Sequence, residues 1–115
     1  MGAPQEATVT RCLALFHSTD IPHMDQIAPL FAEHAVYQPL VPRATPKQGR
    51  TAIIAELMRQ FGRYTECRCE LLAMASSDTH VFTERRDHVT MRNGHSMFSS
   101  VNAVFELDAQ HRITA

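Results

Sequence analysis

Apolar residues in the first half of the chain recur at positions i, i+3, i+4 and i+7, the spacing of amphipathic helices. This spacing predicts three helices, over residues 7–18, 23–34 and 50–62. The apolar stripe of the first helix consists of Val9, Cys12, Leu13 and Phe16. Because the first two helices are short and consecutive, we expect them to pack as a hairpin.

From residue 64 onward, apolar and polar residues alternate, which is typical of half-buried strands. The alternation predicts long strands over residues 64–75, 81–91 and 97–107. A turn over residues 108–111 follows, and residues 112–115 begin a further strand that the chain does not complete.

A short strand over residues 35–40 is predicted between the second and third helices. Pro39 must end it, bulge it or confine it to a sheet edge, because proline cannot donate to a strand ladder. Residues 41–49, with two prolines and a glycine, are predicted as a loop. This loop is either a lid over a neighbouring pocket or a plain surface connection.

The loop after residue 91 sets the register of the last two long strands. A two-residue loop, Asn93-Gly94, would set the apolar face of one strand against the polar face of the other. A three-residue loop with Gly94 in the left-handed conformation aligns the apolar faces, so we expect this loop. It places two pairs opposite each other, Asp87 with Ser99 and Arg85 with Val101.

Helices that precede strands indicate an α+β fold rather than a parallel doubly wound sheet. We expect a single domain over residues 1–115, in which a curved antiparallel or mixed sheet folds over three N-terminal helices and leaves a conical cavity. The last strand of that sheet is expected to be missing.

Arg85 and Asp87 fall on the more apolar face of the strand over residues 81–91. Charges are rarely buried unless paired, and one partner left alone in an apolar interior costs about 3–5 kcal/mol. The pair is therefore a candidate site in the cavity wall. Two alternatives remain, namely a half-exposed ion pair contributing about 0–1 kcal/mol, and the reverse parity, with Glu84 and Arg86 inward.

Composition excludes several functions for this chain. The formal charge of -1 gives no basic surface for nucleic acid. No apolar run approaches the roughly 20 residues that span a bilayer, and no secretory signal is visible at the N-terminus. We therefore expect a cytoplasmic protein that binds neither nucleic acid nor membrane.

The cysteines fit a reducing compartment and no metal site. Cys67 and Cys69 lie on one face of a predicted strand, and Cys12 lies on the apolar side of a helix, where cysteine acts as a small hydrophobic residue. Cys-Arg-Cys lacks a second cysteine or histidine pair at ligand spacing, and the seven histidines form no metal motif.

With these residues placed, residues 7–115 resemble the limonene-1,2-epoxide hydrolase branch of the SnoaL-like, nuclear-transport-factor-2-like (NTF2-like) superfamily. Thr83-Glu84-Arg85-Arg86-Asp87 is similar to that family's Thr-Glu-Arg-x-Asp strand, and Tyr37-Gln38 is similar to its Tyr-Gln-Asn. The segments Val104-Phe105-Glu106-Leu107 and Arg112-Ile113-Thr114 resemble the family's penultimate strand and the turn after it.

The resemblance implies a cofactor-independent and metal-free epoxide hydrolase acting on a small apolar epoxide. In that family an aspartate donates a proton to the epoxide oxygen, and a second aspartate, with a tyrosine and an asparagine, holds the attacking water. By position, Asp87 matches the general acid, Arg85 the arginine between the two acids, and Tyr37 one water ligand. A carboxylic acid in this role needs a pKa above its ordinary value of about 3.9.

Two departures from the family pattern weaken the catalytic expectation. Pro39 stands where the asparagine is expected, and the chain ends at Ala115, where the segment bearing the basic aspartate would begin. For a chain of only these residues we expect weak or absent epoxide hydrolysis. The missing strand would leave strand edges unpaired, so we expect a neighbouring chain or a loop to fill the gap and a homodimer to form.

Three functions therefore stand beside one another at this point. The first is epoxide hydrolysis through Tyr37, Arg85 and Asp87. The second is a SnoaL-like cyclase or ketosteroid-isomerase-like enzyme, in which Asp87 moves protons on a carbon acid or stabilises an enolate. The third is a non-catalytic small-molecule-binding or dimeric scaffold domain, in which Arg85 and Asp87 form a satisfied polar network.

Overall fold

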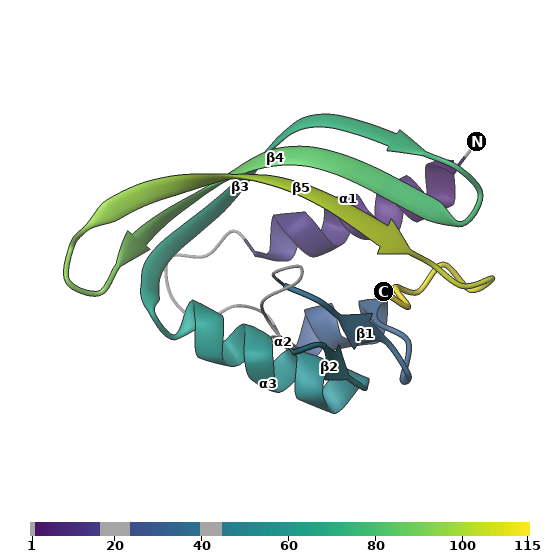
Figure 1. Cartoon of the computed structure of the whole chain (residues 1–115), viewed down its shortest axis with the longest axis horizontal. Coiled ribbons are helices and arrows are strands. Elements are labelled where there is room, and N and C mark those ends of the chain that lie inside the picture. The colour runs from purple at the N-terminus through teal and green to yellow at the C-terminus, as the bar shows by residue number, and fades with distance from the viewer. Residues whose placement is uncertain (1, 17–23, 40–44) are drawn as a thin grey trace.

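The computed structural model describes residues 2–16, 24–39 and 45–115. Its helices are α1 (Ala3–Leu15), α2 (Met24–Ile27), the 3-10 helix η1 (Ala28–Leu30) and α3 (Arg50–Phe61). Its strands are β1 (Val36–Tyr37), β2 (Lys47–Gln48), β3 (Tyr64–Ser76), β4 (His80–Met91) and β5 (Ser96–Glu106). The predicted α+β class is confirmed, since a long antiparallel sheet arches over the helices (Figure 1).

The three long strands form one antiparallel sheet in the order β3-β4-β5. Gly94 has φ 87°, and the Met91 amide donates to the His95 carbonyl at 2.7 Å, so the expected three-residue loop is confirmed. Two pairs follow from this register, Asp87 opposite Ser99 and Arg85 opposite Val101, as predicted.

The first predicted helix begins earlier than expected, at Ala3, with Pro4 in its first turn, where a missing amide N–H costs nothing. The helix predicted over residues 23–34 is wrong beyond its first turn. Only Met24–Ile27 is α-helical, because Pro29 lacks an amide N–H and Phe31 turns to extended backbone at φ -100°, ψ 139°. Residues 17, 18 and 23 of these two predictions lie outside the described residues.

The short strand predicted over residues 35–40 is present as β1 but is shorter, and residue 40 lies outside the described residues. The predicted loop over residues 41–49 contains a second short strand, β2. β2 pairs antiparallel with β1, with Tyr37 opposite Lys47. Of this loop prediction, residues 41–44 lie outside the described residues.

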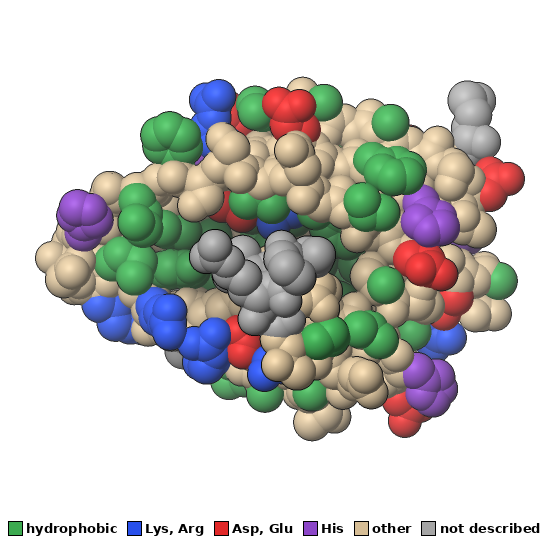
Figure 2. All heavy atoms as spheres, viewed as in Figure 1, with side chains coloured by type: hydrophobic (Ala, Val, Ile, Leu, Met, Phe, Trp, Pro, Cys, Tyr) green, Lys and Arg blue, Asp and Glu red, His purple; other side chains and the backbone are tan. Residues whose placement is uncertain are grey.

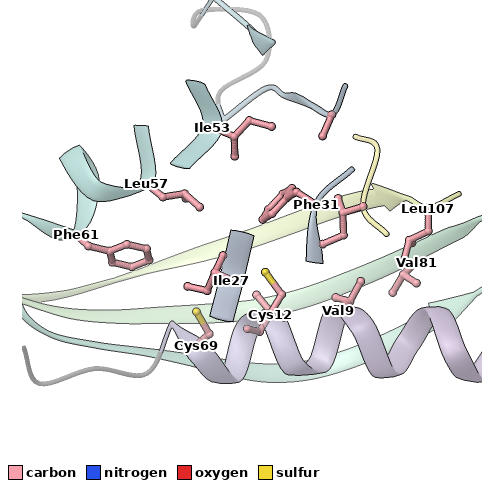
Figure 3. Close-up of a cluster of buried hydrophobic side chains, with 13 residues drawn as sticks. Val9, Cys12, Ile27, Phe31, Ile53, Leu57, Phe61, Cys69, Val81 and Leu107 are labelled. Atoms are coloured by element: carbon pink, nitrogen blue, oxygen red, sulfur yellow. The ribbon is translucent and has the colours of Figure 1, made fainter. Parts of the chain in front are cut away.

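The hydrophobic core lies between α1 and α3, against the inner face of the sheet (Figure 3). Four aliphatic side chains are completely buried there, namely Val9 of α1, Ile27 of α2, Ile53 of α3 and Val81 of β4. The helices and the sheet therefore meet in one cluster. Fully burying an aliphatic side chain of this size stabilises the fold by about 1.5–3 kcal/mol.

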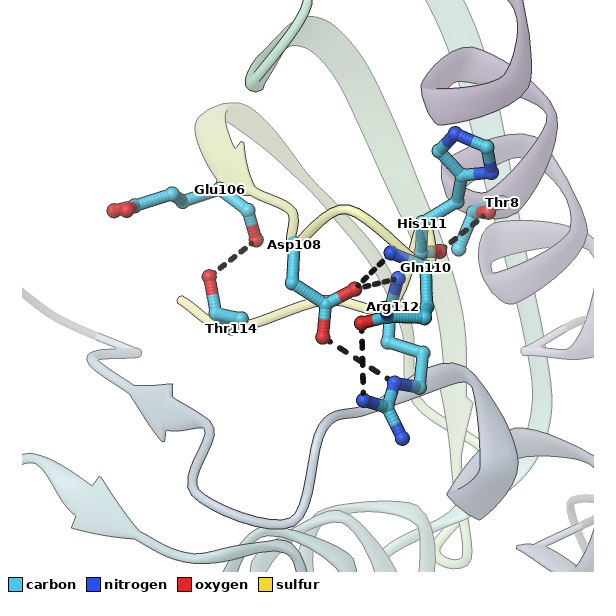
Figure 4. A network of polar contacts seen from close by, with 7 residues as sticks. All are labelled: Thr8, Glu106, Asp108, Gln110, His111, Arg112 and Thr114. Atoms are coloured by element: carbon cyan, nitrogen blue, oxygen red, sulfur yellow. Dashed lines mark hydrogen bonds and ion pairs between the residues drawn. The ribbon is translucent and has the colours of Figure 1, made fainter.

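After β5 the chain turns back over residues 108–111, and side chains of the turn itself stabilise it (Figure 4). The Asp108 carboxylate accepts hydrogen bonds from the amides of Gln110 at 2.9 Å and Arg112 at 3.0 Å. These bonds hold the pKa of Asp108 below its ordinary value.

The residues after that turn lie between β1 and β5. Ile113 makes single bridges to Phe31 and Leu107, so the strand predicted to begin at residue 112 exists as bridges only. The Thr114 amide donates to the Glu106 carbonyl at 2.7 Å, and the Thr114 carbonyl accepts from the Val36 amide at 2.9 Å. None of the described helices is long and apolar enough to cross a membrane.

Candidate functional site

The inner face of β4 becomes more exposed along the strand. Val81 is 0% exposed and Thr83 is 5% exposed, whereas the side chains of Arg85 and Asp87 are 14% and 23% exposed. Their neighbours Glu84 and Arg86 point to the opposite face and are exposed. The structure therefore places Arg85 and Asp87 on the inward side, and the alternative parity is excluded.

Arg85 and Asp87 form an ion pair within this face. The Arg85 Nε donates to the Asp87 Oδ1 at 2.8 Å. The Arg85 Nη1 is buried and has no hydrogen-bond partner among the described residues. An unsatisfied buried donor costs about 1–3 kcal/mol. This nitrogen is therefore a donor that a bound oxygen atom would satisfy.

Tyr37 approaches the site from β1 and is held by α3. The Gln60 Nε2 donates to the Tyr37 hydroxyl oxygen at 3.3 Å and to the Glu56 Oε2 at 2.9 Å. Arg59 holds Glu56 in turn through two hydrogen bonds, at 3.0 and 2.6 Å. Because the Tyr37 oxygen accepts from Gln60, its own O–H remains available to donate.

Burial raises the pKa of Tyr37, although the hydrogen bond from Gln60 and the charge of Arg85 act in the opposite direction. The phenol therefore keeps its proton near neutral pH. The charges of Arg85 and Asp87 both act on Tyr37, so the three predicted residues share one electrostatic environment. Among the described hydrogen bonds, none joins Tyr37 directly to Arg85 or Asp87.

Two thiols border the same carboxylate. Cys69 lies opposite Asp87 on β3, and Cys67 stands two residues before it. The hydrogen bond between the thiols lowers the pKa of Cys67 and raises that of Cys69, and the charges of Asp87 and Arg85 act on both. The sequence analysis placed these two cysteines on one strand face and gave them no part in the candidate site, whereas in the structure they border the Asp87 carboxylate.

The sequence analysis also missed Gln60 and Glu56. Glu56, Arg59 and Gln60 stand at i, i+3 and i+4 on α3, a spacing that brings side chains together on one helix face. That signal was present in the sequence, but similar polar spacing is common on solvated helix faces, and only the position of Tyr37 gives it meaning.

A hollow opens between the sheet and α3 (Figure 2). Hydrophobic side chains line most of its visible wall, and acidic and basic side chains are visible inside it. An apolar hollow with a few converging polar groups is the usual form of a small-molecule site. Among the described residues there is no group of three or more His, Cys, Asp or Glu side chains that could hold a metal ion.

A curved antiparallel sheet that arches over helices is the arrangement of NTF2-like α+β domains. The model of the SnoaL-like domain matches residues 9–115. The chain belongs to this SnoaL-like family, as the resemblance stated above implies. None of the curated proteins matches the sequence.

Solved structures share the fold at low sequence identity. An LEH-like epoxide hydrolase of M. tuberculosis superposes with a TM-score of 0.81 at 20% identity, covering 98% of this chain and 79% of that one. The Δ5-3-ketosteroid isomerase of a Mycobacterium species gives 0.81 at 20% identity, covering 96% and 88%. The epoxide hydrolase/cyclase-like enzyme SalBIII, which has a role in pyran ring formation in salinomycin, gives 0.81 at 17% identity, covering 96% and 84%.

Proposed function

We propose that this domain is a cofactor-independent enzyme of the epoxide hydrolase type, which adds water to a small apolar epoxide to give a diol. The observation that carries the proposal is the Arg85–Asp87 ion pair on the inner face of β4, together with an Arg85 donor that has no hydrogen-bond partner among the described residues. The proposal is also supported by the fold that the chain shares with an LEH-like epoxide hydrolase.

In the proposed reaction, Asp87 first takes up a proton, because the ion pair with Arg85 is its ionised form, and the carboxyl then donates this proton to the epoxide oxygen as the carbon–oxygen bond breaks. The free Arg85 Nη1 donates a hydrogen bond to the same oxygen and stabilises its developing negative charge. The Tyr37 hydroxyl holds the water that attacks the carbon. The water then loses a proton, directly or through solvent, and this proton restores the Asp87 carboxyl.

Turnover by this route is expected to be slow. Among the described residues, Asp87 is the only carboxylate that forms an ion pair with Arg85. Pro39 offers no side-chain amide to hold the water. A reaction with an acid but without a separate base loses the part of the rate that general base catalysis contributes, typically about 10²–10⁴-fold.

A second candidate is proton transfer on a carbon acid, as in a ketosteroid isomerase or a SnoaL-like cyclase. The observation that favours it is the protonated phenol of Tyr37 in the same electrostatic environment as Asp87. Such a phenol can donate to an enolate oxygen while a carboxylate removes the carbon-bound proton. The non-catalytic alternative, a small-molecule-binding domain, uses the same hollow without reaction.

The experiment that tests the proposal measures diol formation from limonene oxide and simple cycloalkene oxides. We expect slow diol production by the wild-type protein, and at least a 100-fold lower rate in Asp87→Asn, because the amide cannot donate a proton as an acid. Glu66→Gln is the matched control, since Glu66 is an exposed carboxylate on β3, and it should retain the wild-type rate.

Deuterium exchange into cyclic ketones separates the second candidate from the first. Exchange by the wild-type protein that Asp87→Asn abolishes, without any diol, would favour the carbon-acid reaction. If the protein forms no diol and catalyses no exchange but still binds an apolar ligand, the non-catalytic binding domain is the remaining interpretation.

A further inference from the structure

Cys67 lies beside the Arg85–Asp87 pair, and the proposed reaction does not use it. On β3, Cys69 is opposite Asp87 and Cys67 is opposite Val89, one step further along the same strand face. The Cys67 side chain is partly buried against the core and, like the other cysteines, is reduced. A partly exposed thiol next to charged groups can meet a ligand and react with it. Cys67 is therefore a nucleophile that still lacks a role.

The neighbouring thiol prepares Cys67 for reaction. Cys69 is 8% exposed and points into the core (Figure 3). The hydrogen bond from Cys69 lowers the pKa of Cys67, against the opposing effects of burial and of the Asp87 charge, and the positive charge of Arg85 also lowers it. Because the thiolate is the nucleophilic form of cysteine, these contacts raise the fraction of Cys67 that can react.

Asp87 is placed to accept the proton that Cys67 loses. It is two residues from Val89, which lies opposite Cys67, and this is roughly 7 Å along the strand. In its ion pair with Arg85 the carboxylate is ionised, so it can accept a proton. Hydrolysis of an epoxide needs Asp87 in its protonated form, whereas removal of a proton from Cys67 needs the ionised form that the ion pair contains.

Two donors in the site suit a ligand oxygen that becomes negative. The Arg85 Nη1 is buried and has no hydrogen-bond partner among the described residues. The Arg85 Nε donates to Asp87, so the guanidinium extends along β4 toward the end of the site that is nearer Cys67. The Tyr37 hydroxyl can also donate, because its oxygen accepts from Gln60. Donors held in place in this way stabilise an oxyanion as it forms.

A conjugated ketone or aldehyde matches this combination of nucleophile and donors. Its electrophilic β-carbon and its carbonyl oxygen are separated by three bonds, so one molecule can present the carbon to the thiol and the oxygen to the donors. Attack at the β-carbon produces an enolate, which needs hydrogen-bond donors but no acid. The hydrophobic wall of the hollow suits the hydrocarbon part of such a ligand (Figure 2).

We propose that Cys67 is a covalent attachment site for α,β-unsaturated ketones and aldehydes that enter the hollow. The Cys67 proton passes to Asp87, directly or through solvent, and the sulfur forms a bond to the β-carbon. The electron pair of the carbon–carbon double bond shifts to give an enolate, whose oxygen accepts from Arg85 and Tyr37. The proton then passes to the α-carbon. The S–H group has been added across the double bond, so no oxidant, reductant or other reactant is needed.

Intact-mass spectrometry of the protein with cyclohex-2-enone at about pH 8 tests the proposal. We expect one adduct per chain, located on Cys67 by peptide mass spectrometry. Cys67→Ser should lower the rate at least about 100-fold, because a serine hydroxyl is a weak nucleophile at its ordinary pKa. Cys12→Ala is the matched control, because Cys12 on α1 is 1% exposed, and it should keep the wild-type rate.

A ratio of two rates tests the donors. Iodoacetamide alkylates the same thiolate without forming an enolate, so the enone rate divided by the iodoacetamide rate does not depend on the thiolate fraction. Arg85→Met and Tyr37→Phe should each lower this ratio at least about tenfold, because removing one donor to an oxyanion costs this much or more. Arg11→Met, on the exposed side of α1, should leave the ratio unchanged.

Three results would each overturn the proposal. They are the absence of an adduct, an adduct that forms as fast on Cys12 or Cys69 as on Cys67, and a ratio that both donor variants leave unchanged. Circular dichroism of every variant checks that it is folded. The readout is the adduct and not a diol, so the failure of the proposed hydrolysis would leave this test intact.

Discussion

The Arg85–Asp87 pair can be tested by its contribution to stability as well as by activity. The side chains are 14% and 23% exposed and joined at 2.8 Å. Removing one partner of a fully buried pair costs about 3–5 kcal/mol. We expect about 2–3 kcal/mol for Arg85→Met, because Asp87 retains some contact with water and the change also removes the unsatisfied Nη1.

A double-mutant cycle isolates the interaction itself. Asp87→Asn should cost about 1–2 kcal/mol, since the amide oxygen can still accept from the Arg85 Nε. The double variant should be about 1–2 kcal/mol more stable than the sum of the two single changes predicts, because contacting charges couple. With an unfolding slope of about 1.5 kcal/mol per molar urea, Arg85→Met lowers the urea midpoint by roughly 1.5 M.

Urea denaturation at pH 7, followed by circular dichroism, measures all four proteins of the cycle. Arg11→Met is the control, because Arg11 lies exposed on α1, and it should change the free energy of unfolding by less than about 0.5 kcal/mol. The reasoning would be refuted if the losses in unfolding free energy of the two single variants simply added in the double variant, or if each loss were as small as that of the control. Either result would show that the pair is an ordinary surface ion pair.

Two further predictions follow from the shifted pKa values. Cys67, whose pKa is lowered, should react first with a thiol reagent at pH 8, and Cys67→Ser should remove this fast phase. Burial raises the pKa of Cys12 to about 12, so Cys12 should react only on unfolding. Equal reaction rates for the two thiols would contradict this prediction. The hydrogen bond from Arg59 lowers the pKa of Glu56 to about 2, so the stabilisation by this carboxylate is present above about pH 4.5 and is lost as the pH falls toward 2. Glu56→Gln should therefore flatten the decline of the urea midpoint between pH 5 and 2, and an unchanged slope would disprove this role.

Where the sequence predicted the fold well, a local pattern was sufficient. The register of β4 and β5 follows from Gly94 and from the requirement that two apolar faces agree. The segment after Ile27 was mispredicted because Pro29 ends the α-helix there and because Phe31 pairs with Ile113, more than 80 residues away. β2 has two residues, too few to show any periodicity.

The sequence likewise predicted only part of the candidate site. Strand parity was enough to place Arg85 and Asp87 on one inward face. The connection from Tyr37 through Gln60 to Glu56 joins β1 to α3, and no pattern within either segment specifies it. The sequence could therefore predict that Arg85 and Asp87 share one face of β4, but not which side chains of different elements hold one another in position.

The proposed reaction depends on the alternation of four consecutive charges on β4. Period two sends Arg85 and Asp87 inward and Glu84 and Arg86 outward. A slip of one residue would exchange the sets and would bury Glu84 and Arg86 in place of a pair that is joined at 2.8 Å. The packing of Val81 and Thr83 against the helices opposes this slip, since the exchange would expose Val81, which is now completely buried. The core thus fixes the direction of all four charges, so a variant that changes one pair leaves the other in place.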